Sequence, residues 1–342
     1  MKLHVAAAVA SMTTLFAAMS AIAAPRTFVA STGSDTNPCS ISQPCRSFGI
    51  ALAKTAPYGE IVVLDSAGYG PVTISQPVTI TAPPGVYAGI SASSGTNGVT
   101  IVPPAQGAAV PLADVTLRGL TIAGGDYGVY AASVPGQSGI NIEIDRCTIA
   151  SNFGGIEIIG NVYGKITQSR ISRFLMWGID VRDGAVVDID RSDVSNEVNS
   201  FGGAIQFLAS IDGILTSGSV TNSNFSNVAV AISATMQTGT SATLKVGVAG
   251  NTIASSGFGI ALYSTGPGQV VVSATGNTIW GGNGLSVLGP GTTIIASGNR
   301  LTGGTYGIQN TNLNGTVITL QNNTVENNVT DIQGPVTLRS VR

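Results

Sequence analysis

The chain has 342 residues, with 15 Lys or Arg, 17 Asp or Glu and a formal net charge of −2 at pH 7. Charged residues make up only 9% of it and glycine accounts for 45 residues, a composition unlike that of ordinary helical globular proteins. A chain with so few basic residues does not attract polyanions by bulk charge, so no nucleic-acid partner is expected.

Residues 1–23 have the features of a secretory signal peptide. Lys2 precedes an apolar run, and the small-x-small sequence "AIA" ending at Ala23 provides a cleavage site. The run is short for a membrane span and no stop-transfer charges follow it. We therefore expect an exported chain, periplasmic or extracellular, with no membrane span once mature. Removal of the signal peptide takes away Lys2 and His4, so the mature chain contains no histidine.

Three cysteines occur in the chain, and two of them are close together. Cys39 and Cys45 flank the loop-like sequence "SISQP". In an oxidising compartment this spacing favours a disulfide between them. Cys147 is then left over, and we expect it to be a small buried thiol with a structural role.

The segment 24–110 is expected to form an N-terminal cap and the first coils of the fold. The stretch from about Cys45 to Thr55 predicts a short amphipathic helix with Phe48, Ile50 and Leu52 on its apolar side. Such a helix would cover the open end of a repeat array, because terminal units need a cap.

Residues 111–342 contain an internal repeat. Aligned on the residue before a short "TI"-like pair, the repeat positions are Cys147, Ser169, Ser192, Ser223, Asn251, Asn277, Asn299 and Asn323. The steps between them are 22, 23, 31, 28, 26, 22 and 24 residues. A period in the low to mid twenties is typical of a solenoid, whose units bury their apolar faces against their neighbours. We therefore expect 24–110 and 111–342 to form one continuous domain.

Each repeat offers three short β segments separated by polar or Gly-rich corners. One follows the repeat position, a second has phrases such as "GGIEI" and "WGIDV", and a third has runs such as "INIEI" and "TTIIAS". Their period-two alternation predicts strands. The predicted fold is all-β: a single-stranded right-handed parallel β-helix with three short strands per coil and a short N-terminal capping helix.

The asparagines of the repeat position have an architectural role in this prediction. Asn251, Asn277, Asn299 and Asn323 lie at one corner, where asparagine tolerates a left-handed backbone. Each side-chain amide can bond to the equivalent corner one coil away, so that a ladder forms and few buried polar groups remain unpaired. The Ser and Cys positions continue the same column.

The second β phrase provides the best candidate site. Aligned on its glycine, the outward column is Tyr130, Glu157, Asp180, Gln206, Ser233, Ala261, Ser286 and Gln309. Glu157 and Asp180 are then like charges one rung apart, with Arg182 further along the same face. Close carboxylates need Arg182, a cation such as Ca²⁺ or a shared proton. The alternative is that these are ordinary solvated charges.

A second charged column is predicted in the third β segment. Glu143, Lys165 and Asp188 should point outward in consecutive coils and form an alternating-sign ladder, which is ordinary for a protein surface.

Aromatic side chains gather in the same middle coils. An aromatic ring can cover the apolar face of a pyranose, although the same rings equally suit loop packing. The candidate ligand-binding residues are Tyr130, Trp177, Gln206 and Lys165.

The sequence "RTFVASTGSDTNPCSISQPCRSFGIALAKTAPYGEIVVLD" (26–65), followed by stacked "NTI" and "GI" units, resembles the pectate-lyase-like superfamily of right-handed β-helix proteins. Within it, the chain is most similar to secreted bacterial β-helix repeat proteins. The resemblance covers nearly the whole mature chain and is specific for architecture, since this fold supports lyases, hydrolases, esterases, adhesins and proteins without a known reaction.

In polysaccharide lyases of this fold, Ca²⁺ on carboxylates neutralises a uronate and an arginine or lysine abstracts a proton. The resemblance therefore implies Glu157 and Asp180 as Ca²⁺ ligands and Arg182 or Lys165 as the base. In a glycoside hydrolase the same carboxylates would be the acid and the second carboxylate.

Departures from the enzyme patterns weigh against catalysis. Without histidine the mature chain lacks the motif of polygalacturonase-like hydrolases, a Ser-His-Asp triad and a zinc ligand set. We favour a secreted, noncatalytic β-helix protein without a cofactor, which binds or presents a surface toward extracellular polysaccharide or envelope components. The alternative is a polysaccharide lyase or glycoside hydrolase on an acidic glycan, with Glu157, Asp180 and Arg182 as its site.

Overall fold

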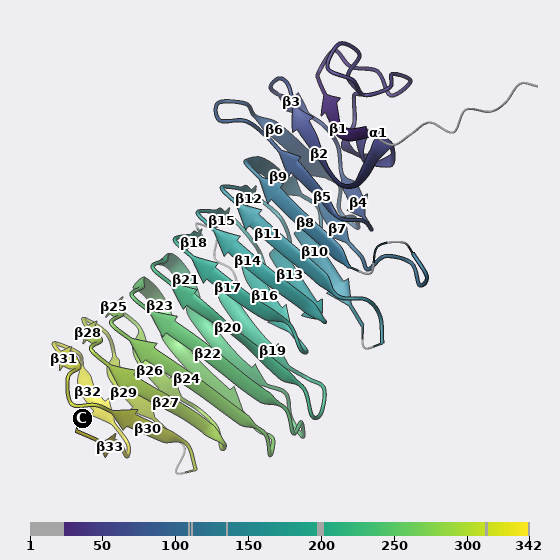
Figure 1. The fold of residues 1–342 in the computed structure, drawn as a ribbon. Helices are drawn as coiled ribbons and strands as arrows, with labels where there is room; N and C mark the ends of the chain where they lie inside the picture. The colour runs from purple at the N-terminus through teal and green to yellow at the C-terminus, as the bar shows by residue number, and fades with distance from the viewer. Residues whose placement is uncertain are drawn as a thin grey trace, which may run out of the picture.

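The protein is an elongated parallel β-helix whose coils stack from the N-terminal to the C-terminal end (Figure 1). The structure is a computed structural model that describes residues 24–108, 110, 112–134, 136–196, 202–311 and 314–340. The predicted signal peptide therefore lies outside the described residues. Within the described part of the chain, no helix is long and apolar enough to cross a membrane.

The first row of strands forms a 13-stranded sheet in which each strand pairs in parallel with its equivalent in the next coil. Its strands are β1 (Ala24–Val29), β2 (Thr55–Val63), β5 (Val78–Thr81), β8 (Ala113–Arg118), β11 (Ile140–Asp145), β14 (Val162–Thr167), β17 (Val186–Asp190), β20 (Leu215–Thr221), β22 (Thr243–Ala249), β24 (Gln269–Thr275), β27 (Thr292–Ser297), β30 (Thr316–Thr319) and β33 (Thr337–Leu338).

The second row contains the shortest strands, which follow the corner that holds the repeat position. They are β3 (Ala67–Gly68), β6 (Ala88–Ala92), β9 (Leu120–Gly124), β12 (Thr148–Ala150), β15 (Arg170–Ser172), β18 (Asp193–Ser195), β25 (Thr278–Trp280), β28 (Arg300–Thr302) and β31 (Thr324–Glu326).

The third row completes each coil. Its strands are β4 (Val72–Ile74), β7 (Val99–Ile101), β10 (Tyr127–Ser133), β13 (Gly154–Gly160), β16 (Ile179–Arg182), β19 (Ile205–Ala209), β26 (Asn283–Val287), β29 (Tyr306–Asn310) and β32 (Thr330–Gln333). Two longer strands, β21 (Asn224–Met236) and β23 (Thr252–Ser264), run through both rows and join them into a 20-stranded sheet. Three strand rows and continuous parallel pairing confirm the predicted architecture.

The interior is a stack of branched aliphatic side chains. In the second row Ile149, Ile171 and Val194 lie in register in successive coils, and all three are fully buried. Each such side chain contributes about 1.5–3 kcal/mol when it is removed from water. Since every coil repeats the pattern, the core runs along the whole solenoid rather than around one centre.

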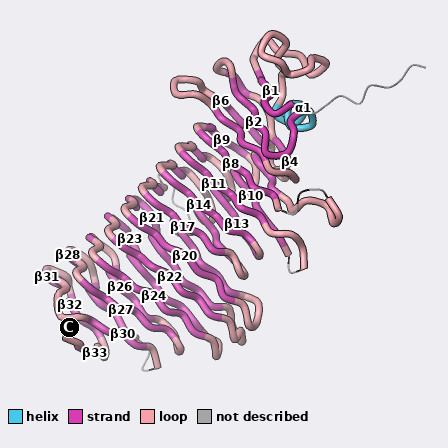
Figure 2. The backbone as a smooth tube through the Cα atoms, viewed as in Figure 1, coloured by secondary structure: helices cyan, strands magenta, loops and turns pink. Residues whose placement is uncertain are grey.

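The N-terminal end is covered by the short helix α1 (Phe48–Lys54), which lies beside the first strands (Figure 2). The helix is shorter than predicted. Its buried side consists of Phe48, Ala51 and Leu52, which share one face at helical spacing, so Ala51 takes the place predicted for Ile50. The predicted disulfide between Cys39 and Cys45 is confirmed.

The asparagine ladder is confirmed at the corner between the first and second rows. Asn251 donates from its side chain to Asn277 Oδ1 at 3.0 Å, Asn277 to Asn299 at 2.9 Å, and Asn299 to Asn323 at 2.8 Å. Serine hydroxyls continue the column by accepting from the backbone N–H one coil before, and Ser169 accepts in this way from Cys147. The side chains thus satisfy backbone groups that the corner would otherwise leave unpaired.

The prediction that the ladder asparagines have a left-handed backbone is wrong by one residue. Positive φ angles occur at the preceding positions, which are Arg146, Gln168, Arg191, Asn222, Gly250, Gly276 and Gly298. The ladder residues themselves turn their side chains inward, where hydrogen bonding rather than backbone tolerance accounts for asparagine. Cys147 is buried in this column, and its burial raises the pKa of the thiol to about 12.

Candidate functional site

The outward column of the third row has the predicted register. Tyr130 lies beside Glu157, Glu157 beside Asp180, and Asp180 beside Gln206 in consecutive coils. Neighbouring parallel strands are roughly 4.8 Å apart, so the two carboxylates occupy adjacent rungs. Regular pairing of β10, β13, β16 and β19 therefore places these side chains on one face.

Arg182 brings both carboxylates together. Its Nη2 lies 2.7 Å from Asp180 Oδ2, and its Nε donates to the same oxygen at 2.8 Å. The Nε also lies 3.5 Å from Glu157 Oε1. One guanidinium thus forms ion pairs with both like charges, which is one of the three alternatives that the sequence left open.

The cluster is much less accessible than ordinary solvated charges would be. Glu157 is 5% exposed and Asp180 is 3% exposed. The hydroxyl group of Tyr127 faces Glu157, and its ring lies over Gly154, where an added Cβ would come within 2.4 Å of it. Buried charges of this kind need the pairing that Arg182 supplies.

Burial shifts the pKa values of the cluster. Desolvation raises the pKa of Glu157 and of Asp180 above the ordinary carboxyl values, although the charge of Arg182 opposes the rise for both. For Arg182, desolvation acts to lower the pKa, but the hydrogen bond and charge of Asp180 together with the charge of Glu157 outweigh it, so its pKa is raised. The guanidinium therefore stays protonated, which is the wrong state for a base.

The residues do not form a typical Ca²⁺ site. The cation binds six to eight oxygen ligands, whereas no group of three or more Asp, Glu, His or Cys suited to a metal occurs among the described residues. Arg182 already provides the positive charge between the carboxylates. Asp180 Oδ1 is nevertheless buried without a hydrogen-bond partner in the described structure.

Lys165 is not part of this cluster. It lies on β14 in the first row, whereas Glu157, Asp180 and Arg182 belong to the third row. Its Nζ is 3.7 Å from Glu143 Oε1, and Lys165 pairs in register with Asp188, which confirms the predicted charged ladder. The structure therefore separates Lys165, which the resemblance implied as one of two alternative bases, from Glu157 and Asp180.

Of the other predicted ligand-binding residues, Tyr130 and Gln206 border the cluster. Tyr130 and Gln206 flank the carboxylates in the outward column, and both are half-buried. Tyr130 stacks at a tilt on Tyr127 with ring centroids 5.9 Å apart. The ring of Trp177 lies over Gly203, where an added Cβ would be 2.2 Å from it. These rings cover the strands closely, so each is partly a packing residue.

Sequence reasoning missed a groove that begins at Arg182. It has a volume of about 410 Å³, and its lining is Arg182, Leu208, Ser210, Thr235, Met236, Gln237, Thr238 and Tyr263. We call it the Arg182 groove. Tyr263 contributes an aromatic ring to this lining and is 47% exposed.

The register explains how these groove residues come together. Arg182 pairs with Leu208, Leu208 with Thr235, and Thr235 with Tyr263 in successive coils. This column lies two residues beyond the column of Glu157 and Asp180. Extending the alignment of the second β phrase by two residues would have found Tyr263.

Comparison with known proteins agrees with the architecture. A family described as the right handed beta helix region matches residues 107–272. No curated protein matches the chain in sequence.

Two solved structures are similar in fold. One is the pectate lyase Pel9A, with 13% identity, coverage of 85% of this chain and 78% of that chain, and a TM-score of 0.60. The other is XylC in complex with xylose, with 11% identity, coverage of 83% and 69%, and a TM-score of 0.54. The chain is therefore a right-handed parallel β-helix protein with a pectate-lyase-like fold.

Proposed function

We propose that this protein is exported and binds extracellular polysaccharide, or a glycan of the cell envelope, on the outer face of the third row without cleaving it. The observation that carries the proposal is the Arg182 groove, which combines an exposed tyrosine ring with hydroxyl and amide groups. Its volume of about 410 Å³ is within the range of ligand sites, roughly 300–1,000 Å³.

The lining of the groove suits a sugar. The ring of Tyr263 offers an apolar surface for the C–H face of a pyranose, while Ser210, Thr235 and Gln237 offer donors and acceptors for its hydroxyl groups. Asp183 holds Ser210 in place by accepting from its backbone N–H at 2.7 Å and from its hydroxyl. A pre-positioned polar side chain reduces the ordering cost of binding.

The charged cluster beside the groove supports binding rather than catalysis. Arg182 is paired to two carboxylates and stays protonated, so it does not serve as a base. Glu157 and Asp180 are almost fully buried, which keeps a scissile bond away from their oxygens. In this arrangement the carboxylates orient Arg182 toward the groove.

Two further observations are consistent with the proposal. The solved structures with a similar fold include a pectate lyase and a complex with xylose, so the architecture is used elsewhere with carbohydrates. The disulfide between Cys39 and Cys45 is compatible with export to an oxidising compartment.

The test is a binding and turnover assay on the purified mature protein with a panel of acidic and neutral polysaccharides, with and without Ca²⁺. We expect binding without unsaturated products or new reducing ends. Tyr263→Ala should weaken binding about fivefold or more, since a ring contact contributes about 1 kcal/mol or more. Tyr163→Ala is the matched control, because Tyr163 is 46% exposed but lies on the first row. Equal binding by both variants would contradict the proposal.

Catalysis is the second candidate, favoured by one observation. The raised pKa of Glu157 would suit a general acid, and the unpartnered Oδ1 of Asp180 is available to a substrate or proton if the cluster opens. Turnover of an acidic polysaccharide that disappears in Asp180→Asn, while the variant keeps its fold and its glycan binding, would establish a lyase or hydrolase and overturn the noncatalytic function.

A further inference from the structure

A second hollow lies at the corner that follows the first row of strands, far from the third-row cluster along each coil. It has a volume of about 280 Å³ and is formed by the turn 82–86 together with Arg118 and Arg146. Thr81 pairs with Arg118, and Arg118 with Asp145, so three successive coils contribute to it. Stacking of the coils thus brings together side chains that are distant in the sequence.

Two arginines form one wall and share a single carboxylate. The Nε atoms of Arg118 and Arg146 lie 3.2 Å and 3.1 Å from the same Oδ2 of Asp145. The other oxygen of Asp145 accepts a hydrogen bond from Thr167 at 3.1 Å. The carboxylate is therefore fully used, and the group keeps a net charge of +1. Among the described residues, the terminal nitrogens of neither arginine have a hydrogen-bond partner.

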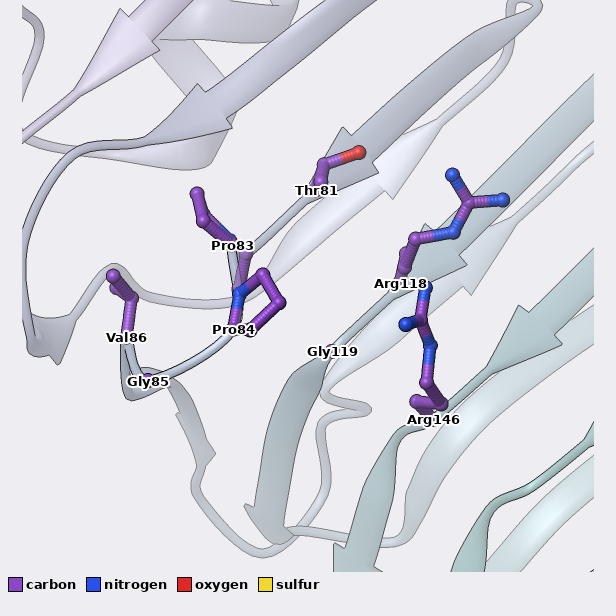
Figure 3. A pocket seen from close by; sticks show the side chains of 9 residues that line it. Thr81, Pro83, Pro84, Gly85, Val86, Arg118, Gly119 and Arg146 are labelled. Carbon is purple, nitrogen blue, oxygen red and sulfur yellow. The ribbon is translucent and has the colours of Figure 1, made fainter.

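The opposite wall is apolar and rigid. Figure 3 shows Pro83 and Pro84 across the hollow from Arg118 and Arg146. Thr81 adds a hydroxyl group whose oxygen is buried and lacks a hydrogen-bond partner within the described structure. The hollow thus offers two cationic forks, a neutral hydroxyl group and a proline surface to one occupant.

We propose that this hollow, the Arg118–Arg146 site, binds the carboxylate of a uronic acid unit. The planar guanidinium fork matches the two oxygens of a carboxylate, and a net charge of +1 matches a monoanion. The prolines pack against the C–H face of the sugar ring, while Thr81 hydrogen bonds to a ring hydroxyl. The site lies apart from the Arg182 groove and adds selectivity for acidic sugars.

The first experiment measures binding of galacturonate and of its methyl ester to the full chain by ligand-observed NMR. The free acid should bind and the neutral ester should bind at least about tenfold more weakly, because a charge-assisted hydrogen bond is lost. Binding of the ester as strong as that of the acid, or no binding of either, overturns the proposal.

Variants test the assignment to these residues. Arg146→Ala should weaken galacturonate binding at least about tenfold, and Arg146→Lys should fall between it and the wild type, since it keeps the charge but not the fork. Arg191→Ala is the matched control: Arg191 has the same corner position, pairs with Asp190 at 2.7 Å and is 60% exposed, against 53% for Arg146. Equal weakening in Arg146→Ala and Arg191→Ala overturns the assignment. If Arg146→Ala does not fold, the comparison of galacturonate binding by Arg146→Lys and by Arg191→Ala tests the assignment instead.

Two further arms separate this site from others. Inorganic phosphate that binds as tightly as galacturonate and displaces it would overturn the sugar assignment and leave a simple oxyanion site. Tyr263→Ala should leave galacturonate binding here unchanged, so a failure of the Arg182 groove to bind glycan is distinguished from a failure of the Arg118–Arg146 site. Loss of galacturonate binding in Tyr263→Ala would place the acid in the groove instead.

Discussion

Replacement of Asn277 by alanine tests whether the ladder stabilises the solenoid. The Asn277 side chain donates to the carbonyl of Val248 at 2.9 Å and to Asn299 Oδ1 at 2.9 Å. Its own Oδ1 accepts from the backbone N–H of Asn251 at 3.0 Å and from the Asn251 side chain at 3.0 Å. Alanine removes all four hydrogen bonds at a position that is 1% exposed, where water cannot replace them.

The magnitude follows from the groups left without partners. The Asn251 backbone N–H would be buried and unpaired, at a cost of about 1–3 kcal/mol, and the hydrogen bond to the Val248 carbonyl would be lost, at about 0.5–1.5 kcal/mol. The Asn251 side chain still donates to the carbonyl of Val220, and Asn299 Oδ1 still accepts a hydrogen bond from the backbone N–H of residue 277. We therefore expect a loss of about 1.5–4.5 kcal/mol in the free energy of unfolding.

Urea unfolding is the assay, followed by circular dichroism and by tryptophan fluorescence, because Trp280 lies at the end of the strand that begins beside Asn277. Coincidence of the two transitions shows that one free energy describes the change. Asn224→Ala is the control, since Asn224 is exposed and donates to Asp193, and its loss should be within about 0.5 kcal/mol. A loss in Asn277→Ala below about 1 kcal/mol, or equal to that of the control, would refute the ladder argument.

Two further predictions concern buried titratable groups. Because the folded pKa of Glu157 is raised above its ordinary 4.5, ionisation disfavours the folded state, and the stability from this group falls as pH rises from that value through the folded pKa. The urea midpoint of Glu157→Gln should therefore increase relative to that of the wild type as pH rises. A relative decrease would contradict the idea that ionisation of buried Glu157 destabilises the fold. Cys147, with its pKa of about 12, should resist iodoacetamide in the native protein and react in urea, so rapid native labelling at neutral pH would show that the column opens.

The ladder shows how much of the fold local pattern predicts. Repeated Asn positions from Asn251 to Asn323, with aliphatic residues two places on, indicated stacked coils, and the hydrogen bonds confirm the column. The same pattern misplaced the left-handed residue by one position. Spacing alone does not distinguish a corner residue whose backbone turns from its neighbour whose side chain bonds inward.

The sequence by itself determined the period, the three strands per coil, the disulfide pair and the register that aligns Glu157 with Asp180. All of these depend on alternation and spacing along the chain, which are local properties. Only the tertiary structure decided that Arg182 joins these carboxylates, that Lys165 lies on another row, and that Tyr263 and the pair Arg118 and Arg146 each line a hollow. Burial and side-chain direction depend on how one coil covers the next, and that packing is set by residues more than twenty positions away.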